Sequence, residues 1–217
     1  MSATTVEPRP TSIPAQHRPP AVALGVGILI VEDDVWLSSR VCRLLETEPG
    51  FRLAWVAESG EEAKSMAEHE PVDVAVVGHR PRSMSGLWLC RELKRTAAPP
   101  AVVIFSACPD AVLAACCVAA EADALVSMYD CDAEVSGVLR RVGLGARLLP
   151  AVPPRVGAML HDRLDPAENA IFSLLLAGIP ATDVAVALRM SQAEFESRRS
   201  ALLGKLESLP AASGARY

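Results

Sequence analysis

The sequence is poor in aromatic residues, which make up 4% of its 217 residues, although 51% are hydrophobic. Much of the hydrophobic fraction is alanine, and small side chains suit helices that pack closely on a parallel sheet. The longest apolar stretch, residues 21–31, is shorter than the ~20 residues that a membrane span needs. The N-terminus lacks the basic start and apolar centre of a signal peptide. We therefore expect a cytoplasmic protein with no membrane partner.

Motifs of enzyme active sites and metal sites are also missing. The sequence has no Walker-type phosphate loop and no serine or cysteine in a nucleophile elbow. Its net charge of −5 does not indicate nucleic-acid binding for the chain as a whole. The six cysteines lack paired metal-ligand spacing and fall mainly in apolar helical patterns, which predicts small reduced core residues. We predict no enzymatic activity, no cofactor and no metal site.

Short apolar runs alternate with amphipathic segments over most of the chain. The apolar runs predict strands at 26–31, 51–57, 73–77, 101–105 and 124–127. Amphipathic segments predict helices at 34–47, 59–69, 86–96, 110–120 and 131–146. In the first helix, Leu37, Val41 and Leu44 recur at the spacing of one helical face. This order predicts an α/β fold, a (βα)₅ doubly wound parallel sheet with its functional crevice at the carboxyl ends of the strands.

Proline-rich stretches divide the chain into four parts. Residues 1–22 are rich in Pro, Thr and Ser and predict a disordered tail. Residues 23–147 form the predicted α/β domain. Residues 148–163 contain several prolines and little that continues the preceding helix, so we predict a linker there. Residues 164–210 then predict a small all-α domain.

Four segments follow one another in a distinctive order within the α/β domain. They are GILIVEDD (27–34), DVAVVGHRPRSMSGL (73–87), AVVIFSA (101–107) and EADALVSM (121–128). In order and spacing they resemble the receiver domain of bacterial response regulators. The resemblance spans roughly residues 26–146, and it implies the receiver fold for this region.

The resemblance also implies a set of site residues. In that family an aspartate on the third strand accepts a phosphoryl group, an acidic pair holds Mg²⁺, a Ser or Thr follows the phosphoryl group, and a lysine pairs with it. The acidic pair corresponds to Glu32 and Asp33, and the hydroxyl to Ser106. The aspartate position is Gly78 and the lysine position is Met128. Two groups that phosphorylation needs are therefore absent, and the remaining carboxylates should hold Mg²⁺ weakly.

Two nearby residues are poor substitutes for the missing aspartate. Asp73 lies five residues upstream of Gly78, about 16 Å away along an extended strand, so its side chain cannot reach the crevice. His79 is adjacent, but a loop histidine that faces solvent is the favoured interpretation. We predict a degenerate phosphorylation pocket that carries out no phosphotransfer.

Helix signals recur in the segment 164–209. Asp165 is a suitable N-cap for a first helix, and Gly178 can end it. A short helix is expected at 181–188, and Ser191 then caps a third helix. The apolar stripe of this third helix is predicted to contain Phe195, Leu202 and Leu206.

This succession of three helices and two turns is similar to the helix-turn-helix of NarL/FixJ/LuxR-type regulators. In that family the third helix enters the major groove of DNA. The resemblance places Glu196, Ser197 and Ser200 on the base-facing side. It makes four further side chains available for phosphates or bases: Gln192, Arg198, Arg199 and Lys205. The domain is not basic, and the carboxylate of Glu196 repels phosphate although it can accept a hydrogen bond from cytosine N4. We therefore expect a modest affinity for DNA, which a dimer must increase by joining two half-sites.

Together the two resemblances predict an atypical, orphan response regulator of the NarL/FixJ/LuxR type. Within that type it is similar to the RedZ-like, pathway-specific activators of antibiotic biosynthesis in actinobacteria. The expected partners are double-stranded promoter DNA and a second copy of the chain in a homodimer. One hypothesis for its control is constitutive dimerisation, with protein abundance setting the output.

A second hypothesis makes the former phosphorylation crevice a site for a small-molecule ligand, such as a pathway product. His79, Trp88 and Tyr129 are then expected near Met128. The alternative function is a protein-interaction module. Its receiver-like domain would bind a small ligand or a partner, and its C-terminal helices would not bind DNA.

Overall fold

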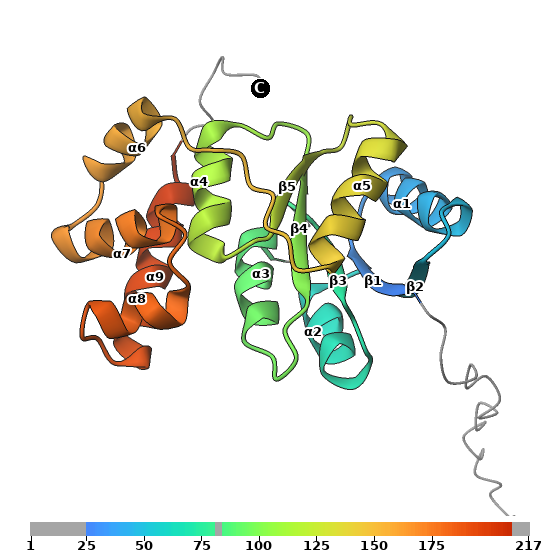
Figure 1. Ribbon diagram of the computed structural model, residues 1–217, viewed down its shortest axis with the longest axis horizontal. Coiled ribbons are helices and arrows are strands. Elements are labelled where there is room, and N and C mark those ends of the chain that lie inside the picture. Colours follow the sequence, from blue (N-terminus) through green and yellow to red (C-terminus); the bar gives the residue numbers. More distant parts are fainter. Residues whose placement is uncertain (1–24, 81–83, 210–217) are drawn as a thin grey trace, which may run out of the picture.

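A parallel five-stranded sheet forms the centre of the N-terminal part of the protein (Figure 1). The computed structural model describes residues 25–80 and 84–209, so the predicted tail at 1–22 lies outside it. The strands are ordered β2-β1-β3-β4-β5, and every neighbouring pair is parallel. They are β1 (Val26–Val31), β2 (Phe51–Ala57), β3 (Val74–Gly78), β4 (Ala101–Ser106) and β5 (Ala124–Ser127). The predicted doubly wound α/β fold is confirmed.

Five helices cover the two faces of this sheet. They are α1 (Val35–Thr47), α2 (Gly60–His69), α3 (Gly86–Lys94), α4 (Ala111–Ala120) and α5 (Asp132–Gly143). Alternate strand residues point to opposite faces. Ile28 and Ile30 therefore pack with α1 and α5, whereas Leu29 and Val31 pack with α2, α3 and α4. As predicted, Leu37, Val41 and Leu44 of α1 are buried.

The fourth helix differs from an ordinary surface helix of an α/β domain. All ten residues of α4 are buried, and none of them carries a charge. A helix that is apolar all round must be covered on every side. The sheet covers one side of α4, and the C-terminal helices cover the other.

The C-terminal helices are α6 (Pro154–His161), α7 (Pro166–Leu176), α8 (Ala181–Ala187) and α9 (Gln192–Glu207). Helix α6 lies inside the segment 148–163, where the sequence predicts only a linker. The prolines of this segment start the helix instead of breaking it, because Pro154 occupies the first helical position, where no N–H is needed. Val156 and Leu160 are buried and anchor α6 to the common core.

The capping signals of the C-terminal helices act as the sequence predicts. Asp165 caps α7 and forms a capping box with Glu168. Gly178 follows α7 with a φ of 80°, a conformation that favours glycine. Ser191 caps α9, and the predicted stripe of this helix is buried: Phe195, Leu202 and Leu206.

Helix α9 contacts α4 along the boundary between the two parts of the molecule (Figure 1). One hydrophobic core cluster runs without a break from the sheet through α4 into α7 and α9. The α/β domain and the C-terminal helices therefore share a core in this arrangement.

Candidate functional site

The carboxyl ends of the strands form a crevice that contains the predicted pocket residues. A cavity of about 590 Å³ is lined by Glu32, Asp33, Ser106 and Met128. Gly78 ends β3 beside them. The structure thus brings together all five residues that the sequence assigns to a degenerate phosphorylation pocket.

The carboxylate of Glu32 occupies the place where a side chain at position 78 would begin. A Cβ atom built on Gly78 would lie 2.1 Å from Oε2 of Glu32. The other carboxylate oxygen, Oε1, accepts a hydrogen bond from the backbone N–H of Asp34 at 3.0 Å. Glu32 therefore fills the space that a side chain at position 78 would occupy.

This position changes the acidity of Glu32. Burial raises the pKa of its carboxyl group above 4.5, and the neighbouring Asp33 raises this pKa further, against a lowering effect of the Asp34 N–H. A carboxyl group with a raised pKa is a weaker ligand for a hard cation than a fully ionised pair. Among the residues that the structure describes, no three His, Cys, Asp or Glu side chains are placed to hold one metal ion.

The raised pKa predicts a pH-dependent stability. Between pH 4.5 and the folded-state pKa, the folded chain keeps the Glu32 proton that the unfolded chain has lost. The contribution of Glu32 to the free energy of unfolding is therefore fully present below pH 4.5 and is lost as the pH rises through the folded-state pKa. We expect Glu32→Gln to resist urea better than wild type at neutral pH, with the gap closing toward pH 4.5. Glu46→Gln, at an exposed position of α1, controls for the loss of one negative charge. A gap that stays constant with pH would contradict the prediction.

The other crevice residues have structural partners. The hydroxyl of Ser106 accepts a hydrogen bond from the N–H of Cys108 at 3.1 Å. The carbonyl of Met128 accepts one from Nη1 of Arg40 at 2.5 Å, which ties helix α1 to the loop after β5. Asp73 lies at the opposite end of the sheet, where its Oδ2 accepts from the N–H of Gly27 at 2.6 Å, so it does not reach the crevice.

Of the three residues expected near Met128, His79 lines the same cavity as Met128, whereas Trp88 and Tyr129 do not. His79 is half-buried and lines the cavity, so it does not project freely into solvent. This burial lowers the pKa of its imidazole. Tyr129 is 74% exposed. Trp88 lies on α3, where the guanidinium of Arg91 is 5.0 Å from the centre of its ring. Neither Trp88 nor Tyr129 lines the cavity.

One wall of the cavity comes from the C-terminal part of the chain. Leu206 and Glu207 of α9 and the following Leu209 line it together with residues of the sheet. The hydroxyl of Ser85, the N-cap of α3, donates a hydrogen bond to the carboxylate of Glu207. Helix α9, which the sequence predicts to contact DNA, therefore closes part of the crevice at the carboxyl ends of the strands.

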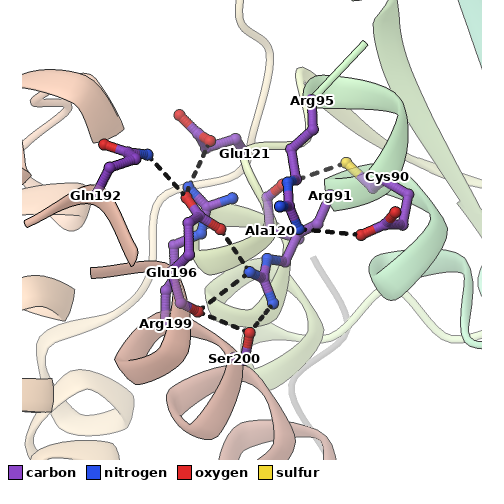
Figure 2. A network of polar contacts seen from close by, with 10 residues as sticks. Cys90, Arg91, Arg95, Ala120, Glu121, Gln192, Glu196, Arg199 and Ser200 are labelled. Atoms are coloured by element: carbon purple, nitrogen blue, oxygen red, sulfur yellow. Dashed lines mark hydrogen bonds and ion pairs between the residues drawn. The ribbon is translucent and has the colours of Figure 1, made fainter. Parts of the chain in front are cut away.

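Three of the predicted DNA contacts are turned toward the α/β domain, as Figure 2 shows. Nη2 of Arg91 donates to Oε2 of Glu196 at 2.7 Å, and Nη1 of Arg91 donates to the hydroxyl of Ser200 at 2.7 Å. Arg199 donates from Nη1 to Oε2 of Glu121 at 2.6 Å. In this arrangement Glu196, Arg199 and Ser200 cannot also touch DNA.

The remaining four predicted contacts are less covered. Gln192, Ser197 and Lys205 are exposed, and Arg198 is partly exposed. Three of them already have partners within the C-terminal helices. Nε2 of Gln192 donates to Oε1 of Glu196 at 3.4 Å. Nε of Arg198 donates to Glu194 at 3.1 Å, and Nζ of Lys205 donates to the buried Glu168 at 2.6 Å.

No sequence pattern predicts the two residues that hold α9 against the α/β domain, Arg91 and Glu121. Arg91 lies on α3 among other charged residues, and Glu121 directly follows the uncharged helix α4. Glu121 adopts a left-handed conformation with φ of 60°, which is uncommon for a residue with a side chain. That conformation is the only local irregularity that marks it, and a sequence does not reveal it.

Comparisons with known proteins agree with this architecture. Residues 28–127 match the family model of the response regulator receiver domain. The α/β domain therefore has the fold of a receiver domain. No curated protein matches the chain. The match runs from Ile28 within β1 to Ser127 at the end of β5 and includes Glu32, Gly78 and Ser106.

Solved structures resemble both parts of the chain. The RcsB response regulator of Salmonella typhimurium has 14% identity and a TM-score of 0.53, with 86% of this chain and 94% of that chain covered. RcsB of Salmonella enterica serovar Typhimurium, bound to the promoter rprA in the presence of phosphomimetic BeF3−, has 16% identity and a TM-score of 0.53 at the same coverage. A LuxR-family two-component response regulator from Aurantimonas sp. SI85-9A1 has 19% identity and a TM-score of 0.54, with 65% and 99% covered. At these identities the likeness shows the fold, a receiver domain followed by a helical region.

In the part of the chain that the structure describes, no helix is both long and apolar enough to cross a membrane.

Proposed function

We propose that this protein is a DNA-binding transcriptional regulator whose receiver domain works without aspartyl phosphorylation. The observation that carries the proposal is the geometry at Gly78, where the carboxylate of Glu32 fills the space of a phosphoacceptor side chain. With no carboxylate at position 78 and no cation at Met128, an acyl phosphate has neither an acceptor nor a partner. The two-domain neighbours, one of them bound to promoter DNA, support the output function.

DNA recognition in this proposal depends on α9. Glu196, Ser197 and Ser200 face the bases, and Gln192, Arg198, Arg199 and Lys205 are available for phosphates or further bases. Because three of these side chains lie against the receiver domain, the described arrangement is a closed form. DNA binding then requires α9 to separate from the receiver domain.

The finer assignments are part of the same proposal. We infer a cytoplasmic homodimer that acts as a pathway-specific, RedZ-like activator of antibiotic biosynthesis in an actinobacterium. A dimer is favoured because the helical domain has few free cations, and two half-sites multiply a modest single-site affinity.

A small-molecule input is a second candidate, favoured by the cavity at the crevice. The cavity takes walls from both domains, with Phe105 and Leu113 on one side and Leu206 on the other. A ligand held there would contact both domains and bias their separation. Calorimetric titration of the full chain with pathway products tests this candidate, and the absence of heat with all of them would contradict it.

The regulator hypothesis predicts DNA binding that needs no phosphodonor. We expect wild-type protein to retain an upstream fragment of its own genome with the same affinity whether or not acetyl phosphate and Mg²⁺ are present, because position 78 has no carboxylate. Fluorescence anisotropy at several salt concentrations measures this affinity. A large increase in affinity caused by acetyl phosphate would contradict phosphorylation independence.

A matched pair of variants tests the DNA contact itself. Arg198→Ala should weaken binding to all sequences and reduce the slope of affinity against salt by about one counterion. Arg43→Ala removes the same charge from an exposed position on α1 and should leave binding unchanged. If neither variant nor wild type binds any fragment at low salt, the protein-interaction alternative is favoured.

A further inference from the structure

We propose that Arg91 of the receiver domain competes with operator DNA for the side chains of Glu196 and Ser200, and that this competition sets the DNA affinity of the protein. The inference rests on the proposed function, because it assumes that α9 reads DNA. It assigns control of DNA affinity to a receiver residue that lies outside the crevice at the carboxyl ends of the strands.

The geometry of Arg91 matches the hydrogen-bonding capacity of these two residues. Its two terminal nitrogens reach separate acceptors, the carboxylate of Glu196 and the hydroxyl of Ser200, each at 2.7 Å. Nη2 also lies 3.4 Å from the carbonyl oxygen of Glu196. A glutamate on a reading helix accepts from the N4 amino group of cytosine, and here it accepts from a guanidinium instead. One carboxylate cannot serve both donors in the same geometry.

Arg199 lets the reading helix keep part of this network after separation. Its Nη1 lies 3.7 Å from Oε1 of Glu196, three residues away on the same helix, in addition to its bond with Glu121. Separation removes Arg91 and Glu121, the two partners contributed by the receiver domain. Glu196 and Arg199 lie three residues apart on α9, so each keeps a neighbour of opposite charge after separation. Figure 2 shows both residues in the arrangement before separation.

The contact between α9 and the receiver domain also includes an unfavourable contribution to its free energy, which favours separation. The Nε atoms of Arg91 and Arg199 are buried and have no hydrogen-bond partner. A buried donor without a partner is unfavourable, and hydration on separation removes that cost. The apolar surface of α4 opposes separation, because leaving it uncovered is unfavourable. The unpaired Nε atoms favour separation of α9 from the receiver domain, and the apolar surface of α4 opposes it. Because these two contributions oppose each other, the Arg91 contact can decide whether the two domains separate.

The test compares two arginines one helical turn apart on the receiver domain. Arg91→Met retains an apolar stem of similar length over Trp88 and removes the charge. Arg95→Ala removes the same charge from a side chain that is 58% exposed. In anisotropy titrations of full-length protein with the retained upstream fragment, we expect Arg91→Met to bind about tenfold more tightly than wild type, since losing one partner of a buried charge pair has an effect of at least this size. Arg95→Ala should bind like wild type.

A measurement without DNA separates the inference from the proposed function. Small-angle X-ray scattering of the same proteins should give a larger radius of gyration for Arg91→Met, and a wild-type value for Arg95→Ala. If Arg91→Met matches wild type in both affinity and radius, the inference is overturned while DNA binding stands. If Arg91→Met expands but its affinity is unchanged, competition for Glu196 is overturned. If Arg91→Met expands and no protein binds DNA at low salt, the proposed function fails, and the competition fails with it.

Discussion

Replacement of Gly86 by alanine is expected to lower the free energy of unfolding by about 3 kcal/mol, the upper part of the usual range for overpacking. A Cβ atom at this position would lie 2.0 Å from the carbonyl oxygen of Gly78 and 3.0 Å from its carbonyl carbon. Both atoms belong to the backbone at the end of β3, so no flexible side chain can move aside. Helix α3 would have to shift away from the sheet.

A glycine in another receiver helix provides a matched control. Gly137 lies within α5, and a Cβ atom there would meet nothing within 4 Å. Gly137→Ala should raise stability by about 0.5–1 kcal/mol, because alanine loses less conformational freedom in a helix. Urea denaturation followed by circular dichroism measures both variants. Equal effects of the two substitutions would show that the close approach at Gly86 tolerates a methyl group.

The close approach at Gly86 also bears on function. It fixes the start of α3 against the end of β3, and Arg91 lies on the same helix five residues later. A displacement of α3 would move the Arg91 guanidinium relative to Glu196. We therefore regard Gly86 as a residue that positions the interdomain contact, in addition to supporting the sheet.

The sequence predicted the sheet accurately because its signals are local. Each buried strand is a short apolar run, and the caps at Asp165 and Ser191 involve residues only a few positions apart. Helix α6 was missed because prolines that can break a helix can also start one, and only packing of Val156 and Leu160 decides which applies.

The residues of the crevice were predictable from the sequence, but the side-chain contacts within it and between the two domains were not. The order of the strands brings Glu32, Gly78 and Ser106 to one edge of the sheet, so their proximity follows from topology. That Glu32 fills the space above Gly78 depends on a side-chain conformation. The contact between Arg91 and Glu196 joins residues 105 positions apart in the chain, and no periodic pattern carries information about such a pair.

The wholly apolar composition of α4 was a signal that the sequence did offer. Its segment AVLAACCVAA has no polar residue to face solvent, whereas the other receiver helices carry charges on one side. Such a helix indicates that a further element covers the α/β domain. The pattern cannot identify that element as α9, because a second chain would satisfy it equally well.

Truncation of Phe195 to alanine is expected to lower the free energy of unfolding by about 3–5 kcal/mol. Phe195 is fully buried on α9, in the core cluster that continues into α4 and the sheet. The substitution leaves a cavity and also removes the ring that lies 5.5 Å from the Arg199 guanidinium. Val186→Ala, on α8 at a side chain that is 76% exposed, should change stability by less than about 0.5 kcal/mol.

Two spectroscopic probes distinguish a shared core from independent domains in this experiment. All three tryptophans lie in the receiver domain, and Trp36 and Trp55 are remote from α9, so the fluorescence reports mainly on that domain. Circular dichroism reports on the helices of the whole chain. Because α4 and α9 belong to one core cluster, we expect Phe195→Ala to shift both urea transitions to the same lower midpoint. A shift seen by circular dichroism, with unchanged tryptophan fluorescence, would mean that the C-terminal helices unfold without the receiver domain and that α4 tolerates exposure when α9 leaves it.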